Sequence, residues 1–243
     1  MILQFSLRKS LILRSLSHNQ LKSSVIIAID GFASTGKSTI AKMLSSHYQI
    51  PFIDSGAFYR GITYFALENG LFKEGVLDEE SLSTALENLN IRFHPNSSDL
   101  FLNGKNISDK IRLPVISENV STVAKLPFVR DFLLRELRTM GSEKGLIMDG
   151  RDIGSVVFPD ADYKFFFNAR PEIRALRRYE ELRLKGEKTT FEEVLNNLIH
   201  RDKIDSAREV APLQKPIDAF EVDTSDISTQ EVFSLLAKKI DTK

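Results

Sequence analysis

A short glycine-bounded segment constrains what this chain can fold into more than any other part of its sequence. Residues 31–39 read GFASTGKST and fit the pattern G-x-x-x-x-G-K-[ST]. Glycines let such a loop curl until successive backbone N–H groups point inward around the β- and γ-phosphates of a nucleotide. The helix that follows adds its positive dipole end. We therefore predict a phosphate-binding loop in which Lys37 reaches the phosphates and the Ser38 hydroxyl coordinates Mg²⁺.

The segments that flank the loop provide the context that this pattern requires. Residues 25–29, VIIAI, form an apolar and largely β-branched run that is typical of a strand buried on both faces. Residues 38–44 suit a helix. Strand, loop and helix in this order favour a nucleotide site over a glycine turn without a ligand. The residues expected to contact the nucleotide are Gly31, Phe32, Ala33, Ser34, Thr35, Gly36, Lys37, Ser38 and Thr39.

Composition excludes several other classes of protein. The 33 basic and 33 acidic residues give a formal net charge of +0, so there is no global electrostatic case for binding nucleic acid or a membrane surface. No apolar run approaches the roughly 18 residues of a membrane-spanning helix. The chain has no cysteine, which excludes disulfides and thiolate metal sites. The four histidines lack metal-ligand spacing and are interpreted as surface or structural; they are His18, His47, His94 and His200.

The first 24 residues differ in character from the remainder of the chain. They contain arginines and lysines but no acid, since the first acidic residue is Asp30. Such a segment resembles an organelle transit peptide. A disordered extension or a start site assigned too far upstream are the alternatives, and we favour these. The folded domain is expected to span residues 25–243.

Predicted strands and helices alternate along most of this domain, which indicates an α/β fold of three layers around a central parallel sheet. The expected strands are residues 25–29, 50–53, 145–149, 163–167 and 220–223. Residues of about 78–126 break the alternation and are interpreted as an inserted subdomain, with a short helix at 82–89, short strands at 91–93 and 100–102 and a hairpin turn at Asn103-Gly104. Further helices are expected at 57–69, 115–125, 129–140 and 171–185.

Polar segments follow two of these strands, at the edge where open α/β sheets bind ligands. Asp54-Ser55-Gly56-Ala57-Phe58-Tyr59-Arg60 follows the second strand. Asp149-Gly150-Arg151-Asp152 follows the strand at 145–149. Two acids and an arginine in one short segment are costly to desolvate unless they bind a ligand or each other. We favour a ligand site over a salt-bridged loop.

Two further helices carry grouped charges. Arg174, Arg177 and Arg178 stand at i, i+3 and i+4, so they share one helix face. They are expected to repel one another unless phosphates or nearby acids answer them. On a later helix Arg201, Asp205 and Arg208 also share a face.

Together these segments resemble the bacterial cytidylate kinases, a family of nucleoside monophosphate kinases. The resemblance spans about residues 25–240 and is carried by the loop, by residues 54–60, by residues 149–159 (DGRDIGSVVFP) and by Arg201-Asp202, Asp205 and residues 208–213 (REVAPL). It implies a P-loop NTPase fold with an inserted NMP-binding subdomain and a helical lid at about 171–190. It also implies the reaction ATP + CMP or dCMP → ADP + CDP or dCDP, with Mg²⁺ accompanying ATP.

The resemblance implies a role for each matching position. Acceptor binding falls to Ser55, Tyr59, Arg60, Ser121, Arg130, Arg151, Asp152, Arg201, Asp205 and Arg208. Within this group Ser121, Arg130 and Asp152 read the cytosine edge, Arg201 and Asp205 contact the sugar, and Arg151 and Arg208 bind phosphate. The lid arginines Arg174, Arg177 and Arg178 close over ATP. The residues implied in catalysis are Lys37, Asp149, Arg151 and Arg208.

The chain departs from the family pattern in three places: the leader of 24 residues, Phe32 where proline is frequent, and Lys203-Ile204 where another arginine can stand. Two rival hypotheses stay open. One is a kinase on the same scaffold that acts on UMP, AMP or a non-nucleotide acceptor. The other is a GTP-hydrolysing switch, although no N/T-K-x-D guanine-reading segment is found. A monomer in the cytoplasm is the expected state.

Overall fold

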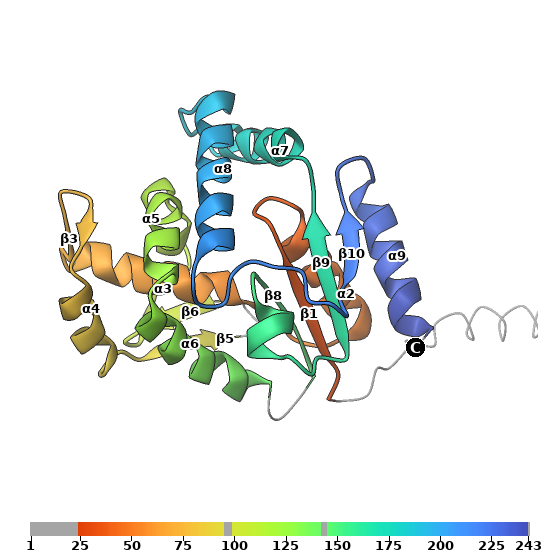
Figure 1. Ribbon diagram of the computed structural model, residues 1–243, viewed down its shortest axis with the longest axis horizontal. Helices are drawn as coiled ribbons and strands as arrows, with labels where there is room; N and C mark the ends of the chain where they lie inside the picture. The colour runs from red at the N-terminus through yellow and green to blue at the C-terminus, as the bar shows by residue number, and fades with distance from the viewer. Residues whose placement is uncertain (1–23, 95–98, 142–144, 243) are drawn as a thin grey trace, which may run out of the picture.

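The computed structural model describes residues 24–94, 99–141 and 145–242. The predicted extension at residues 1–24 lies outside the described residues, apart from Ser24. Figure 1 shows a central sheet with helices packed on both of its faces and a pair of helices standing beyond one edge of the sheet. This is the predicted three-layer α/β fold.

The described part of the chain forms one parallel sheet of five strands in the order β10-β9-β1-β8-β2. Their bounds are Ile26–Gly31 for β1, Phe52–Asp54 for β2, Leu146–Gly150 for β8, Tyr163–Asn168 for β9 and Phe220–Asp223 for β10. Each lies within two residues of its predicted position. In the centre of the sheet Ile29 pairs with Asp149 and with Phe165. The phosphate-binding loop and the polar segment after β8 therefore leave the same edge side by side.

Side chains of β1 alternate between two hydrophobic cores, as the period of a strand requires. Ile27 and Ile29 join the core beneath α2 (Lys37–Tyr48) and α9 (Thr229–Asp241). Ala28 points to the opposite core. The helices of that second side are α3 (Ser55–Glu68), α5 (Pro114–Ala124) and α6 (Pro127–Met140). The turn η2 (Ile153–Val157) packs on this side as well.

The segment predicted as an insert contributes a small antiparallel sheet and shares the second core. Residues of about 78–126 contain α4 (Glu79–Leu86), β5 (Ile91–His94), β6 (Asp99–Leu102), β7 (Lys105–Asn106) and η1 (Lys110–Arg112), together with α5. The hairpin of β3 (Phe72–Lys73) and β4 (Val76–Leu77) directly precedes the predicted insert. Asn103 and Gly104 have φ of 48° and 78°, which is the left-handed conformation that the predicted hairpin turn requires. Ile91 and Leu100 pack against Gly61 of α3, where a Cβ would lie 2.8 Å from Leu100. The glycine thus lets the insert approach the body closely.

The helices beyond the sheet edge are α7 (Pro171–Leu184) and α8 (Phe191–Ala207). They lie against one another above the carboxyl ends of the strands (Figure 1). A capping box begins α8: the Thr190 hydroxyl accepts from the Glu193 N–H, and the Glu193 carboxylate accepts from the Thr190 N–H. Gly186, with φ of 78°, ends the first helix. The division into body, insert and lid stays a prediction about how these parts move.

No helix among the described residues is both long and apolar enough to cross a membrane.

Candidate active site

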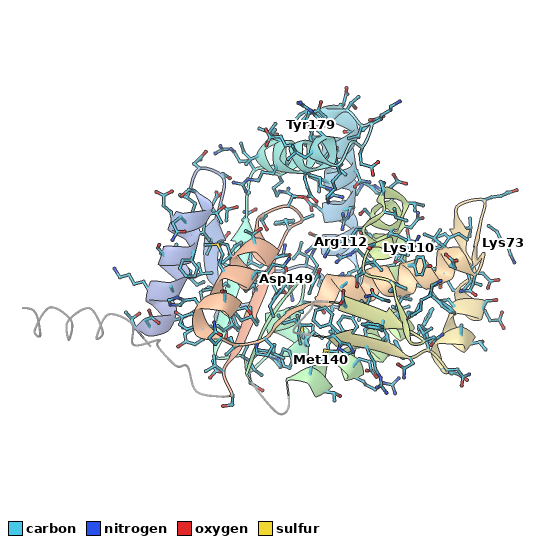
Figure 2. The ribbon with its side chains drawn as sticks, turned by 180° about the vertical axis from the view of Figure 1, so that it is seen from behind. Lys73, Lys110, Arg112, Met140, Asp149 and Tyr179 are labelled. Atoms are coloured by element: carbon cyan, nitrogen blue, oxygen red, sulfur yellow. The ribbon has the colours of Figure 1, made fainter. Side chains whose placement is uncertain are left out.

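A cavity of about 1080 Å³ opens at the carboxyl ends of β1, β2 and β8. Its wall combines the phosphate-binding loop, the first turn of α3, the face of α5, the segment after β8 and the inner faces of α7 and α8. Figure 2 shows Asp149 near the centre of the molecule, with Arg112 on the insert side of it, and both residues line the cavity.

Most of the residues predicted from sequence meet in this one cavity. They are residues 33–39 of the loop with Ser55, Tyr59, Arg60, Ser121, Arg130, Asp149, Arg151, Asp152, Arg177, Arg178, Arg201, Asp205 and Arg208. Three predicted residues do not line it: Gly31, Phe32 and Arg174. Sequence reasoning missed Arg112 as a site residue and placed Asp54 in the polar segment after the second strand without a role of its own, although both line the cavity. The local pattern around Arg112 carries no signal, because η1 brings it to the wall through tertiary packing.

The loop is wrapped around its own lysine. Lys37 is buried, and its Nζ donates to the carbonyl oxygen of Phe32 at 2.5 Å. Ser34 and Gly36 have φ of 59° and 90°, so the backbone curls as the glycine pattern predicts. Burial and the positive charge of Arg151 lower the pKa of Lys37 to about 7. A neighbouring anion would raise the pKa of Lys37 again and keep its side chain positively charged. The site therefore favours phosphate.

Phe32 and Arg174 form the underside of the loop. The Arg174 guanidinium lies 5.2 Å from the centre of the Phe32 ring and forms an ion pair with Asp202 of α8 at 2.7 Å. Its Nε donates to the carbonyl oxygen of Ala169 at 2.9 Å. Arg174 is only 3 % exposed. These contacts fasten α7 and α8 to the loop from behind.

Arg177 and Arg178 of α7 line the cavity but have partners of their own. Arg177 donates to the hydroxyl of Thr224 at 3.1 Å and to its carbonyl oxygen at 2.5 Å. Arg178 pairs with Glu181 at 2.8 Å. Acids and oxygen acceptors thus offset part of the predicted repulsion between the arginines of this helix face.

Ser38 and Asp149 form a set of oxygens that fits a magnesium ion. The Ser38 hydroxyl donates to Asp149 Oδ2 at 2.5 Å, while the buried Asp149 Oδ1 has no hydrogen-bond partner. Burial and the neighbouring Asp54 carboxylate raise the pKa of Asp149 to about 6. No group of three or more acidic, histidine or cysteine side chains that could hold a metal occurs in the described ranges. The Ser38 and Asp149 oxygens fit Mg²⁺, which takes one or two protein ligands and completes its shell with phosphate and water.

On the insert side a buried ion pair lies between Arg130 of α6 and Asp152. Both side chains are 5 % exposed. Arg130 also donates to the carbonyl oxygen of Ala124 at 3.0 Å, and its guanidinium lies 5.4 Å from the centre of the Tyr59 ring. Arg208 Nη2 lies 3.8 Å from Asp152 Oδ1 and has no hydrogen-bond partner. The corner therefore offers one flat ring and fixed donors and acceptors to a polar planar ligand.

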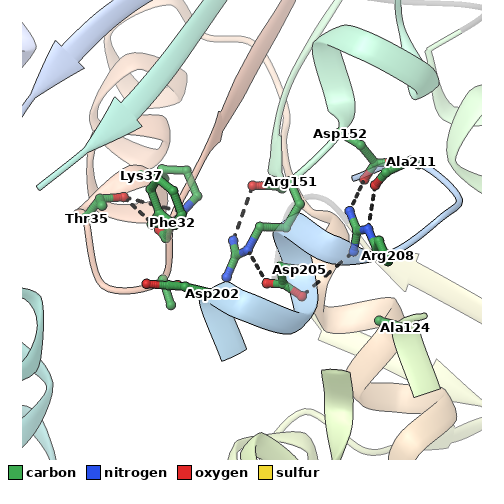
Figure 3. Close-up of polar contacts among 12 residues, drawn as sticks. Phe32, Thr35, Lys37, Ala124, Arg151, Asp152, Asp202, Asp205, Arg208 and Ala211 are labelled. Atoms are coloured by element: carbon green, nitrogen blue, oxygen red, sulfur yellow. Dashed lines mark hydrogen bonds and ion pairs between the residues drawn. The ribbon is translucent and has the colours of Figure 1, made fainter. Parts of the chain in front are cut away.

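Between the loop and this corner, positive charge is concentrated. Arg151 Nε donates to Asp205 Oδ2 at 3.0 Å, and the buried Arg201 Nε has no partner (Figure 3 draws the Arg151 contacts). Burial and the charge of Arg151 lower the pKa of Arg201 to about 10. Arg60 pairs with Asp54 at 2.7 Å. Like charges held this close together are stabilised by phosphate groups between them.

The cavity thus joins a phosphate-binding loop to a second, arginine-rich polar corner. The family model described as cytidylate kinase matches residues 27–242. The chain belongs to the cytidylate kinase family. All four motifs that carry the resemblance lie in this range.

Relatives of this cytidylate kinase family member are similar along nearly their whole length. A protein named cytidylate kinase from Bacteroides thetaiotaomicron is 48% identical over 211 residues, which cover 85% of this chain and 92% of the relative. A cytidylate kinase from Phocaeicola vulgatus is 46% identical over 219 residues, covering 88% and 96%. One from Flavobacterium johnsoniae is 41% identical over 220 residues, covering 89% and 96%.

Proposed function

We propose that this chain transfers the γ-phosphoryl group of ATP directly to CMP and dCMP, giving ADP with CDP or dCDP. The observation that carries the proposal is a single cavity with the Lys37 loop at one end and the Arg130–Asp152 pair at the other. Membership of the cytidylate kinase family supports the choice of acceptor. The activity belongs to pyrimidine nucleotide metabolism.

ATP binds with its phosphates in the loop. The backbone N–H groups of residues 33–39 surround the β- and γ-phosphates, and Lys37 exchanges the Phe32 carbonyl for a phosphate oxygen. Arg177 and Arg178 cover the donor from α7. Arg174 acts from beneath, through Phe32 and Asp202, and holds the lid helices on the loop.

Ser38 and the unpartnered oxygen of Asp149 would hold Mg²⁺ beside these phosphates. When bound, the ion neutralises charge on the β- and γ-phosphate oxygens. Asp149 accepts a hydrogen bond from the Ser38 hydroxyl and so orients this side of the site. It needs no role as a strong base, because phosphoryl transfer mainly requires that the reacting groups are aligned and that their charge is neutralised.

The acceptor phosphate lies between Arg60, Arg151 and Arg208. Two phosphate anions at contact distance repel each other, and the guanidinium groups screen that repulsion while the acceptor oxygen is aligned with the γ-phosphorus. The buried Arg201 and Arg208 nitrogens without partners gain phosphate or sugar oxygens. Arg201 and Asp205 face the sugar from α8.

The cytosine is read by Ser121, Arg130 and Asp152. These residues are buried, so a base that fails to pair with them leaves polar groups without partners. That penalty rejects a wrong base more strongly than a loss of apolar contact would. Closure of α7, α8 and the insert over both nucleotides excludes water and so protects ATP from hydrolysis. Cytoplasmic location and a monomeric state stay predictions.

The proposal is tested by a coupled ADP-release assay with ATP, Mg²⁺ and, in separate reactions, CMP, dCMP, UMP, AMP and GMP. We expect kcat/KM to be highest for CMP and dCMP. A kcat/KM for AMP equal to or above that for CMP would contradict the acceptor assignment. A reaction without acceptor measures ATP hydrolysis, which is expected to be slow; rapid hydrolysis would favour a nucleotide-hydrolysing switch.

A further inference from the structure

Asp30 is a buried acid that the proposed mechanism does not use. It stands in β1 directly before Gly31 and is 2 % exposed. Because strand side chains alternate, Asp30 points to the same side of the sheet as Ala28, towards α3, α6 and η2. A buried carboxylate is costly unless hydrogen bonds satisfy it, so its partners show what it does.

The partners of Asp30 are two backbone N–H groups at the start of η2. Ile153 N–H donates to Oδ1 and Gly154 N–H donates to Oδ2, each at 2.7 Å. The first N–H groups of any helical turn lack partners within the turn. An Asp, Asn, Ser or Thr that begins such a turn commonly satisfies one of them with its own side chain.

The residue that begins η2 is Asp152, and its side chain makes no such cap. Its carboxylate instead holds the Arg130 guanidinium and lies 3.8 Å from that of Arg208. A carboxylate in this position has two competing uses, since it can cap its own turn or face the cavity. Asp30, which stands 123 residues before Ile153, caps the turn in its place.

We propose that Asp30 is a positioning residue for the acceptor site, which caps the turn after Asp152 and thereby leaves the Asp152 carboxylate free to hold Arg130 and to read the base. Asp30 also joins the strand that leads into the phosphate-binding loop to the segment that carries Arg151 and Asp152. The expected effect on the kinetics rests on the proposed function. The hydrogen bonds of the cap are a feature of the structure and do not depend on that function.

The geometry allows little tolerance at this contact. A Cβ at Gly154 would lie 3.3 Å from Asp30 Oδ2 and 3.2 Å from the Lys164 side chain. An asparagine at position 30 keeps the size of the side chain but accepts with only one oxygen, and its amide N–H group would face a second donor. Asp30→Asn therefore removes one bond of the cap at nearly constant volume.

The first test is steady-state kinetics of Asp30→Asn. We expect KM for CMP to rise on the order of tenfold, as the loss of a buried charge-assisted hydrogen bond implies. KM for ATP is expected to stay within about twofold, because the loop keeps its own contacts. Gly154→Ala places a methyl group against Asp30 Oδ2 and so disturbs the same hydrogen bond from the donor residue. It should also raise KM for CMP. This second variant tests the inference if Asp30→Asn does not fold.

A double-mutant cycle separates positioning from general stability. If Asp30 acts through Asp152, then Asp30→Asn should raise KM for CMP much less in an Asp152→Asn background than in the wild type. Tyr48→Phe is the matched control: it removes a hydrogen bond to Asp241 at 2.8 Å on the far side of the sheet. The control should change neither KM.

Amide hydrogen exchange supplies a readout that does not depend on activity. Exchange at Ile153 and Gly154 is expected to be faster in Asp30→Asn than in the wild type, and unchanged in Tyr48→Phe. Equal rises in both KM values, an additive cycle or unaltered exchange would overturn the inference. Failure of the wild type to phosphorylate CMP would instead contradict the proposed function. Amide hydrogen exchange would still decide whether Asp30 caps this turn.

Discussion

Replacement of Arg151 by alanine is expected to separate turnover from folding. Its side chain lines the cavity, is 21 % exposed and lies beside Lys37, Asp205 and Arg201. A single arginine that neutralises transition-state charge is worth about 10³–10⁵ in rate in phosphoryl transfer. Because Lys37 and Arg201 still supply positive charge here, we expect kcat to fall by about 10³-fold, at the low end of that range.

The cost to stability should be modest. Arg151→Ala removes the hydrogen bond from Nε to Asp205, but Asp205 keeps the Arg208 guanidinium at 3.8 Å. Loss of a hydrogen bond to a charged group costs roughly 1–3 kcal/mol. Relief of the repulsion between Arg151 and Lys37 offsets part of this, since Arg151 helps to lower the pKa of Lys37. For a chain of this size the melting temperature should fall by about 2–8 °C.

The assay compares kcat by ADP release with the melting temperature followed by circular dichroism. Arg170→Ala is the matched control, because Arg170 pairs with Asp226 at an exposed site outside the cavity. We expect the control to keep its kcat. A kcat for Arg151→Ala within tenfold of the wild type would refute the role assigned to this arginine, and so would an equal loss of kcat in the control.

Three further outcomes follow from the structure. Arg174→Met leaves Asp202 without its buried partner, so a urea titration should show a loss of about 3–5 kcal/mol of unfolding free energy. KM for ATP should change less. A large rise in KM for ATP at unchanged stability would instead support the direct contact with ATP that the sequence predicts for Arg174. Burial, helped by the charge of Asp152, raises the pKa of Asp30 to about 7 from an ordinary 3.8, although the hydrogen bonds from Gly154 and Ile153 and the charge of Lys37 act to lower this pKa. As the pH rises, Asp30 loses its proton at a lower pH in the unfolded chain than in the folded protein. The unfolding free energy of the wild type relative to Asp30→Asn should therefore fall between about pH 4 and pH 7, by up to roughly 1.4 kcal/mol per pH unit. A difference in unfolding free energy that is independent of pH would contradict this. Removal of residues 1–24 should leave kcat unchanged, and loss of folding would show that the segment packs on the domain.

Sequence reasoning predicts the parts of this site that are encoded locally. The loop with Lys37 and Ser38, the strand before it and the polar segment after β8 all follow from short-range patterns, and the parallel sheet brings them together at one edge. The capping box of Thr190 and Glu193 is another feature that is encoded locally, since the two residues stand three positions apart. Helix and strand bounds shift by only a few residues.

The remainder depends on contacts between distant segments. Arg174 shares a helix face with Arg177 in the sequence, yet Asp202 and the Phe32 ring draw it beneath the loop. Arg112 reaches the cavity because η1 packs on α3, which no periodicity in its own segment reveals. The cap that Asp30 places on Gly154 likewise joins residues more than a hundred positions apart.

The most direct test of the account is one reaction that contains ATP, Mg²⁺ and equal amounts of CMP, dCMP, UMP, AMP and GMP, with the nucleoside diphosphates separated by anion-exchange chromatography. Direct competition gives the ratio of kcat/KM values at the same active site. We predict that CDP and dCDP form first and together exceed UDP and GDP. The ADP formed should equal the sum of these diphosphates, because phosphorylation of AMP or hydrolysis of ATP would add further ADP. Products dominated by another nucleoside diphosphate, or ADP release without any acceptor product, would contradict it.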